Sequence, residues 1–214
     1  MLCLNIFFLS YYNNMSKIIF ATNNNSKILE LKNIMNDFNM DILSMSEAGI
    51  KIDIEETGKT YEENALIKTR AINKLFKNDI IIADDSGLEI DYLNGEPGIY
   101  SARYLGHDTP QTVKNQKILK LLEGVKTDER TARFICCIAA FIPSIGEITT
   151  QGTLEGQIGY EEKGNNGFAY DKIFFLPNRN CYLAEISEEE KNKISHRASA
   201  IKKMKSKFIE LGIL

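Results

Sequence analysis

The feature that most constrains the fold is the stretch over residues 80–91, which reads IIIADDSGLEID. Its β-branched apolar residues predict a fully buried strand, and the change to two carboxylates, a hydroxyl and a glycine predicts that the strand ends there. Adjacent strand residues point to opposite faces, so we expect different roles for Asp84 and Asp85. Ligands of open α/β sheets bind beyond strand ends, which makes this stretch a candidate site. The alternative for so short a match is a solvated turn.

Length and composition indicate one globular domain with a small-molecule partner. The chain has 214 residues, 43% hydrophobic and 26% charged, and its net charge of -3 does not indicate a nucleic-acid surface. Four cysteines without CxxC spacing favour a reducing cytosol over a disulfide framework or a structural zinc site. The apolar run near the start is too short to span a membrane. We therefore expect residues 1–15 to be an extension, disordered or a start-site artefact, ahead of a single catalytic domain over residues 16–214.

A strand, a polar loop and a helix follow one another near the start of the domain. Residues 17–21 (KIIFA) predict a buried strand, and apolar residues at helical spacing from Ile28 predict a helix with Asn25 or Ser26 as its N-cap. Backbone N–H groups and the positive helix end at such a junction favour an anion. Side-chain donors there come from Thr22, Asn23 and Lys27. The alternative is an asparagine-rich capping loop without a ligand.

A second loop and helix carry further polar residues. Thr60 and Glu63 form a capping box, which places a helix start there and Glu56 in the loop before it. Asn64 and Lys68 are four residues apart and so lie on one side of that helix. The alternative is that this side is a solvated surface.

Strands and one loop dominate the following part of the chain. Residues 133–142 predict a long apolar core strand, and residues 147–152 and 153–159 predict two more exposed, antiparallel strands. Residues 164–171 (GNNGFAYD) predict a flexible loop. Its aromatic side chains are able to stack on a base, although most such residues simply pack.

The C-terminal part predicts two helices. Ser187 caps a short helix that carries Lys191, and Ser195 opens a final helix. His196 and Arg197 follow at its start, where they are donors suited to an anion or a carbonyl oxygen.

Five separated blocks, in the family's order, resemble the inosine triphosphate pyrophosphatases, also called noncanonical purine NTP pyrophosphatases. The blocks are ATNNNSK, ETGKTYEENA with Lys68, ADDSGLE, GFAYD, and Lys191 with SHR. The resemblance implies a Mg²⁺-dependent enzyme that hydrolyses ITP, dITP and XTP to the monophosphate and pyrophosphate, cleansing the nucleotide pool. It also implies a long twisted mixed β-sheet flanked by helices (α/β class), with two lobes and a central cleft. A cytoplasmic homodimer is the expected assembly.

The resemblance also implies roles for individual residues. Asp85 is the expected proton acceptor, Lys27 offsets charge on the polyphosphate, and Glu56 and Asp85 hold the metal. These carboxylates suit Mg²⁺, which prefers hard oxygen ligands. The expected substrate-binding residues are Thr22, Asn23, Asn24, Asn25, Ser26, Lys27, Lys68, Ser86, Phe168, Ala169, Tyr170, Asp171, Lys191, His196 and Arg197.

Two positions depart from the family's pattern. Ala169 stands where glycine is common, and Lys172 stands where proline is common. Alanine disfavours positive φ, so we expect a shifted or less mobile loop that alters Michaelis constants at most.

Other functions stay open. Maf-like nucleotide pyrophosphatases resemble this fold and take modified or pyrimidine triphosphates, but the blocks at 56–68 and 196–197 argue against that class. A non-catalytic nucleotide sensor would bind ITP without turnover, and intact Asp85 and Lys27 make it a poorer fit. A purely structural domain would leave the polar residues at element ends unexplained. We expect neither a nucleic-acid nor a membrane partner.

Overall fold

The computed structural model describes residues 17–36 and 40–214. Its strands are β1 Lys17–Phe20, β2 Asp41–Ser44, β3 Ile80–Ile90, β4 Thr131–Ile142, β5 Gly146–Ile158, β6 Phe174–Leu176 and β7 Cys181–Tyr182. Its α-helices are α2 Asn25–Ile34, α3 Tyr61–Asn73, α4 Gln111–Leu121, α5 Glu188–Ile194 and α6 His196–Glu210. The strands form one seven-stranded sheet in the order β2-β1-β3-β4-β5-β6-β7. Because β1 pairs in parallel with β2 and β3 while β6 pairs antiparallel with β5 and β7, the sheet is mixed.

The chain packs as two compact units, each with its own hydrophobic core. Unit 1 takes in the residues up to Asp85 together with Cys137–Gln151 and Ala200–Leu214, and unit 2 takes in Ser86–Cys136 and Gly152–Ser199. The expected mixed sheet with flanking helices is confirmed, while the central cleft and the single catalytic domain over residues 16–214 stay predictions. The expected extension over residues 1–15 lies outside the described residues.

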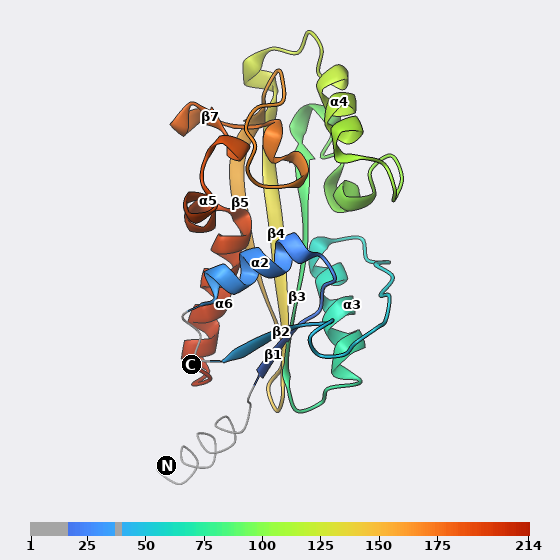
Figure 1. Cartoon of the computed structure of the whole chain (residues 1–214), viewed down its shortest axis with the longest axis vertical. Helices are drawn as coiled ribbons and strands as arrows, with labels where there is room; N and C mark the ends of the chain where they lie inside the picture. Colours follow the sequence, from blue (N-terminus) through green and yellow to red (C-terminus); the bar gives the residue numbers. More distant parts are fainter. Residues whose placement is uncertain (1–16, 37–39) are drawn as a thin grey trace. The chain divides into compact units, whose positions relative to one another are not determined.

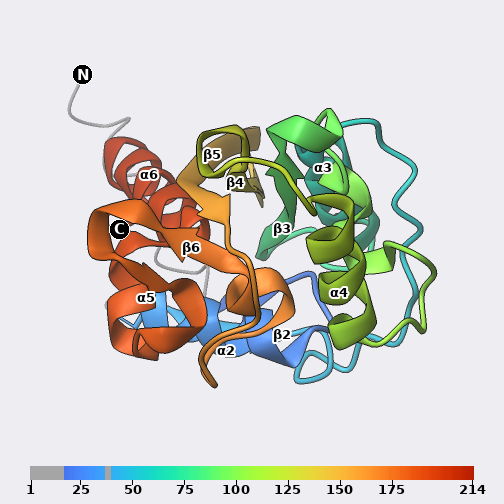
Figure 2. The same cartoon turned by 90° about the horizontal axis from the view of Figure 1, so that it is seen from above.

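Unit 1 is built on the parallel strands β1, β2 and the first half of β3. Helices α2 and α3 lie on different sides of these strands (Figures 1 and 2). One cluster of its buried core consists of Ile19, Ala21, Met45, Ile50, Ile72, Ile81 and Ala83. The N-cap of α2 is Asn24, whose side chain accepts a hydrogen bond from the Lys27 N–H, so the predicted caps Asn25 and Ser26 are wrong. Asn24 keeps an extended backbone and both following residues are already helical.

Unit 2 has a hydrophobic core of its own. Helices α4 and α5 lie well apart in this unit, with β6 nearer to α5 (Figure 2). The buried core consists of Leu88, Ile90, Ile118, Leu122, Val125, Ala132, Phe134, Ile158, Tyr170, Ile173, Phe174, Leu176, Leu183 and Ile186.

The long strand β5 corrects the prediction of two strands over residues 147–159. It runs without a break from Gly146 to Ile158. A Cβ on Gly156 would lie 2.5 Å from the ring of Phe174. Gly156 thus makes room for an aromatic side chain from the neighbouring strand. The predicted break between Gly152 and Thr153 lies inside the continuous strand, where Gly152 is buried.

Strand β3 corrects the reading of the Asp-Asp-Ser-Gly stretch. The strand continues to Ile90, so both the predicted end at Asp84 and the alternative of a solvated turn are wrong. Leu88 and Ile90 are fully buried in the core of unit 2, and this burial keeps the polar residues before them in a strand. Asp84 and Asp85 consequently lie buried in mid-strand.

The predicted helix starts at Thr60 and Ser187 are confirmed. Each side chain accepts a hydrogen bond from the backbone N–H three residues later. Among the described helices, none combines the length and apolar character that crossing a membrane requires.

Candidate active site

The loop between β1 and α2 carries the first predicted block. The Asn24 N–H donates to Thr22 Oγ1 and the Lys27 N–H donates to Asn24 Oδ1, both at 3.2 Å. Residues 23–26 are exposed, so three asparagines and a serine surround the start of α2. The loop thus combines a helix cap with solvent-facing donors at a positive helix end, which suits an anion.

A cluster of opposite charges lies deep in unit 1. We call Lys27, Glu56, Lys68, Asp84 and Asp85 the carboxylate–lysine cluster. Lys27 Nζ lies 3.0 Å from Asp84 Oδ2, and Asp84 is fully buried. Lys68 Nζ lies 2.7 Å from Glu56 Oε1 and 3.9 Å from Asp85 Oδ1. The two adjacent aspartates therefore face different lysines, as the strand geometry predicts.

Lys68 is more than a surface lysine. Its side chain comes from α3 and also donates to the backbone oxygen of Asp84 at 2.5 Å. Lys68 is only 7% exposed and Asn64, four residues earlier, is 0% exposed, so the alternative of a solvated helix face is wrong. Both predicted metal ligands, Glu56 and Asp85, converge on this one ammonium group.

Burial and charge shift the pKa values in this cluster. Burial raises the pKa of Asp85 above its usual range, and the nearby Lys68 and Lys27 offset only part of this rise. Burial acts to lower the pKa of Lys68, but the charges of Asp84, Asp85 and Glu56 outweigh it and the pKa is raised. Lys68 is therefore positively charged at neutral pH, while Asp85 is a stronger base than an exposed aspartate.

The donor set of Glu56 and Asp85 suits Mg²⁺. In residues 17–36 and 40–214, no three His, Cys, Asp or Glu side chains gather closely enough to hold a metal ion by themselves. Mg²⁺ does not need such a cage, because it is commonly bound by one or two carboxylates with substrate phosphates and waters. Two carboxylates that already share one cation meet that requirement.

A different combination of groups lies in unit 2. Lys191 Nζ lies 2.8 Å from Asp171 Oδ2, and the same oxygen accepts the backbone N–H of Phe168 at 2.8 Å. Lys191 Nζ also lies 4.4 Å from the centre of the Phe168 ring, and Arg197 Cζ lies 5.9 Å from it. Arg197 Nη2 donates to Ser86 Oγ at 3.1 Å. We call these five residues the aromatic–cation cluster.

Two other predicted residues of unit 2 are held by core contacts. The His196 ring stacks on Phe134 with 4.9 Å between ring centres and 15° between planes. The Tyr170 hydroxyl donates to the backbone oxygen of Ser101 at 2.8 Å, and burial raises the pKa of this phenol. The substrate-binding roles of His196 and Tyr170 stay predictions.

The loop that carries Phe168 keeps a backbone typical of glycine. Gly167 has φ 72°, and a Cβ there would collide with the Asp171 carboxylate. Ala169 has φ 53°, although alanine in the left-handed region costs about 1–2 kcal/mol. Lys172 uses its backbone oxygen, which accepts the Lys163 N–H at 2.9 Å and which a proline would also provide. Neither departure from the family pattern removes a contact described here.

The predicted blocks include Asn64 and Asp84, but sequence analysis gave neither a role in the site. Asp84 is the partner of Lys27, and Asn64 donates to Asp85 Oδ2 at 3.0 Å. The signal for Asn64 was its four-residue spacing from Lys68. Nothing in the sequence pairs Asp84 with Lys27, because the two are 57 positions apart.

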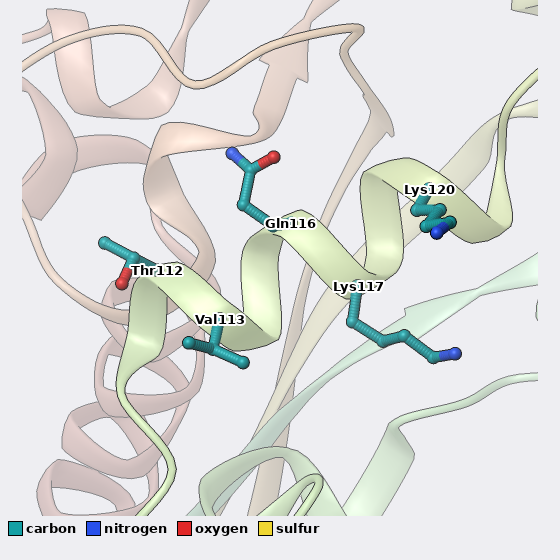
Figure 3. Close-up of a pocket in the computed structure, with 5 residues that line it drawn as sticks. All are labelled: Thr112, Val113, Gln116, Lys117 and Lys120. Carbon is teal, nitrogen blue, oxygen red and sulfur yellow. The ribbon is translucent and has the colours of Figure 1, made fainter.

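A hollow of about 380 Å³ on α4 lies outside every predicted block. It is lined by Thr112, Val113, Gln116, Lys117 and Lys120, which all project from this one helix (Figure 3). The lining combines two flexible lysines with uncharged side chains on an exposed helix face. We therefore place the candidate functional residues in the two clusters, one in each unit, and not at this hollow.

Comparison with known proteins identifies the family. The model of the Ham1 family matches residues 18–207, which is most of the chain. This chain belongs to the Ham1 family. The match covers the first four predicted blocks and the Lys191 block, so the recognition from motifs is confirmed.

Individual Ham1 relatives are similar over nearly their whole length. A protein of Clostridium perfringens named dITP/XTP pyrophosphatase is 50% identical over 89% of this chain and 96% of its own. A Bacillus subtilis protein of the same name is 45% identical over 92% and 98%. The solved structure of the Staphylococcus aureus Ham1 protein is 41% identical, covers 91% of this chain and 98% of its own, and has a TM-score of 0.81.

Proposed function

We propose that this Ham1 chain is a nucleoside triphosphate pyrophosphatase that hydrolyses ITP, dITP and XTP to the monophosphate and pyrophosphate. The observation that carries the proposal is the convergence of Glu56 and Asp85 on the Lys68 ammonium group. The names of the similar proteins from C. perfringens and B. subtilis support the substrate class.

Glu56 and Asp85 would hold Mg²⁺ in this proposal. The bound ion would neutralise charge on the phosphate oxygens. Asp85 accepts the proton of the attacking water, a task for which the raised pKa of a buried carboxylate is favourable. The water oxygen bonds to phosphorus, the bridging bond between the α- and β-phosphates breaks, and pyrophosphate leaves.

The other groups of unit 1 bind the polyphosphate. Lys27 offsets negative charge on the phosphates, and it reaches them by exchanging its partner Asp84 for a phosphate oxygen. Thr22, the exposed residues 23–26 and the start of α2 supply further hydrogen bonds. Lys68 remains with the carboxylates and limits their mutual repulsion.

The aromatic–cation cluster selects the base. Phe168 offers a ring on which a purine stacks, and Lys191 and Arg197 lie close to that ring. Donors that require the 6-oxo group of hypoxanthine or xanthine reject adenine, because its amino group leaves them unpaired. Such a site discriminates by about 10⁴-fold. Guanine keeps the 6-oxo group, so its rejection requires that the site leave no room or acceptor for the 2-amino group.

Release of pyrophosphate from a panel of triphosphates tests the proposal. With Mg²⁺, fast release from ITP, dITP and XTP but not from GTP, ATP or dTTP is the expected result, and Asp85→Asn should abolish it. A preference for dTTP would indicate the Maf-like class instead, and orthophosphate as the product would contradict a pyrophosphatase. Tight ITP binding without turnover would indicate a nucleotide sensor.

The assembly and cellular location stay proposals of the same kind. We propose a homodimer, for which light scattering should give about twice the chain mass of 24.3 kDa. We also propose a cytoplasmic location, in keeping with a nucleotide substrate. A stable monomer in solution would contradict the first of these.

A further inference from the structure

We propose that Asn64 is a positioning residue that ties the Glu56 loop to Asp85, an inference that rests on the proposed roles of Glu56 and Asp85 as metal ligands. One amide side chain makes both connections. Asn64 Nδ2 donates to Asp85 Oδ2 at 3.0 Å, and Asn64 Oδ1 accepts the backbone N–H of Gly58 at 2.8 Å. Gly58 stands two residues after Glu56, so the amide joins the two segments that supply the carboxylates.

The chemistry of the two contacts requires an amide. The Gly58 N–H needs an acceptor and the Asp85 carboxylate needs a donor, and the asparagine side chain offers one of each in a fixed plane. Because the Gly58 N–H needs an acceptor, the end of the Asn64 amide that faces it is the oxygen. Asn64 is 0% exposed, so water cannot replace either contact.

The contact to Asp85 also orients its carboxylate. Asn64 engages Oδ2, while Oδ1 is the oxygen nearest to Lys68, at 3.9 Å. Because Lys68 also binds Glu56 at 2.7 Å, Asn64 turns Oδ1 toward the side on which the second carboxylate lies. Holding both carboxylates in this arrangement before the metal arrives is what a positioning residue contributes.

A substitution at Gly58 offers a second way to displace the Asn64 amide. A Cβ on Gly58 would lie 2.6 Å from Asn64 Oδ1, 2.7 Å from Glu63 Cβ and 2.9 Å from the Asn64 backbone nitrogen. The φ of Gly58 lies outside the left-handed region, so the demand for glycine is one of space and not of backbone conformation. Gly58→Ala would therefore displace the Asn64 side chain, together with the first turn of α3, without removing any functional group.

The experiment compares wild type, Asn64→Leu, Gly58→Ala and the double variant, with Thr69→Val as a matched control. Thr69 lies on the same helix and is 0% exposed, but its hydroxyl donates only to the Leu66 backbone oxygen at 2.9 Å. Three quantities are measured for each protein: the Mg²⁺ affinity of the free protein by calorimetry, kcat and KM for ITP, and the thermal unfolding temperature.

The expected result is a loss of Mg²⁺ affinity of about 10- to 100-fold in both single variants, with kcat lowered more than KM is changed. The loss of Mg²⁺ affinity in the double variant should be smaller than the sum of the two single losses, because both changes disturb the same amide. Thr69→Val should lower the unfolding temperature and leave Mg²⁺ affinity at the wild-type value.

Equal Mg²⁺ affinity in wild type and Asn64→Leu would overturn the inference, and so would additive losses in the double variant or the same loss in Thr69→Val. If Asn64→Leu does not fold, Gly58→Ala alone decides. The proposed function fails separately: absence of ITP turnover in wild type, with Mg²⁺ affinity still reduced in Asn64→Leu, would reject the function and keep the positioning role.

Discussion

The two clusters differ in what their cations face. In the carboxylate–lysine cluster of unit 1, Lys27 and Lys68 are paired with three carboxylates at 2.7 to 3.9 Å. In the aromatic–cation cluster of unit 2, Lys191 and Arg197 lie beside the Phe168 ring, and one carboxylate, Asp171, balances them. The first arrangement is ready to exchange charges with a metal and phosphates, whereas the second offers a flat surface with donors at its side.

Under the proposed function, this difference gives turnover and selectivity separate structural bases. Changes in unit 1 should alter the rate for every nucleotide alike, because they act on groups that all triphosphates share. Changes in unit 2 should alter the preference between bases. The following predictions test that division, beginning with the largest expected effect.

Asp85→Asn should lower kcat for ITP by about 10²- to 10⁴-fold, because it removes both a proton acceptor and a negatively charged metal ligand. The ratio of kcat/KM for ITP to that for ATP should stay at the wild-type value. Steady-state pyrophosphate release measures both quantities. Asp108→Asn is the control, since the Asp108 side chain is fully exposed. A changed base preference in Asp85→Asn would contradict the assignment of turnover to unit 1 and of base preference to unit 2.

Arg197→Lys should lower kcat/KM for ITP by about 10- to 100-fold and reduce the preference for ITP over ATP. Lysine keeps the charge but loses the planar fork that donates to Ser86, and Arg197 is only 1% exposed. The Mg²⁺ affinity of the free protein should not change. Arg179→Lys, at an exposed ion pair with Glu190, controls for the loss of a guanidinium group. A fall in Mg²⁺ affinity would contradict the assignment of Arg197 to the base.

The pH dependence of kcat/KM should carry the signature of Asp85. Burial raises the pKa of this carboxylate above the ordinary value of 3.8, and the group must be ionised to accept a proton. Activity should therefore fall as the pH drops through that raised pKa, and added Mg²⁺ should move the fall to lower pH because it favours the ionised form. The pKa of Asp85 is higher in the folded than in the unfolded protein, so the folded state binds the proton more tightly. The free energy of unfolding of wild type should therefore rise, relative to that of Asp85→Asn, as the pH falls over the same range. An acid limb that does not respond to Mg²⁺ would assign the titration to another group.

Ala169→Gly should have the smallest effect. Relief of the positive φ should raise the free energy of unfolding by no more than about 1 kcal/mol, or about 2–4 °C in Tm, because glycine also gains freedom in the unfolded chain. We expect a changed KM for ITP and nearly the same kcat. Thermal unfolding with steady-state kinetics measures all three. A large increase in kcat would show that alanine at this position restricts catalysis.

Local signals predicted much of the fold. The β-branched runs at 17–21 and 80–82 became buried strands, and the capping residues Thr60 and Ser187 begin helices where expected. The errors arose where contacts between segments far apart in the chain determine the secondary structure. Burial of Leu88 carries β3 through a turn-like sequence, and β5 continues through Gly152, which is buried in the strand. Three successive asparagines give equal local signals, so the cap at Asn24 was not distinguishable from its neighbours.

The motif blocks predicted which residues of unit 1 lie together but not how they pair. The motif blocks indicated Lys27, Glu56, Lys68 and Asp85, and the structure brings all four together in unit 1. That Lys27 binds Asp84, and that Asn64 holds Asp85 and the Gly58 N–H, depends on the folding of segments far apart in the chain. Spacing along one helix predicts a shared face but not the partner that covers it.

A competition between ITP and ATP in one reaction tests the central claim most directly, because the ratio of the two products equals the ratio of the kcat/KM values. With equal concentrations and Mg²⁺, we predict IMP in excess over AMP by a factor on the order of 10⁴, with one pyrophosphate for each IMP. Similar amounts of IMP and AMP, or inosine diphosphate with orthophosphate, would contradict it.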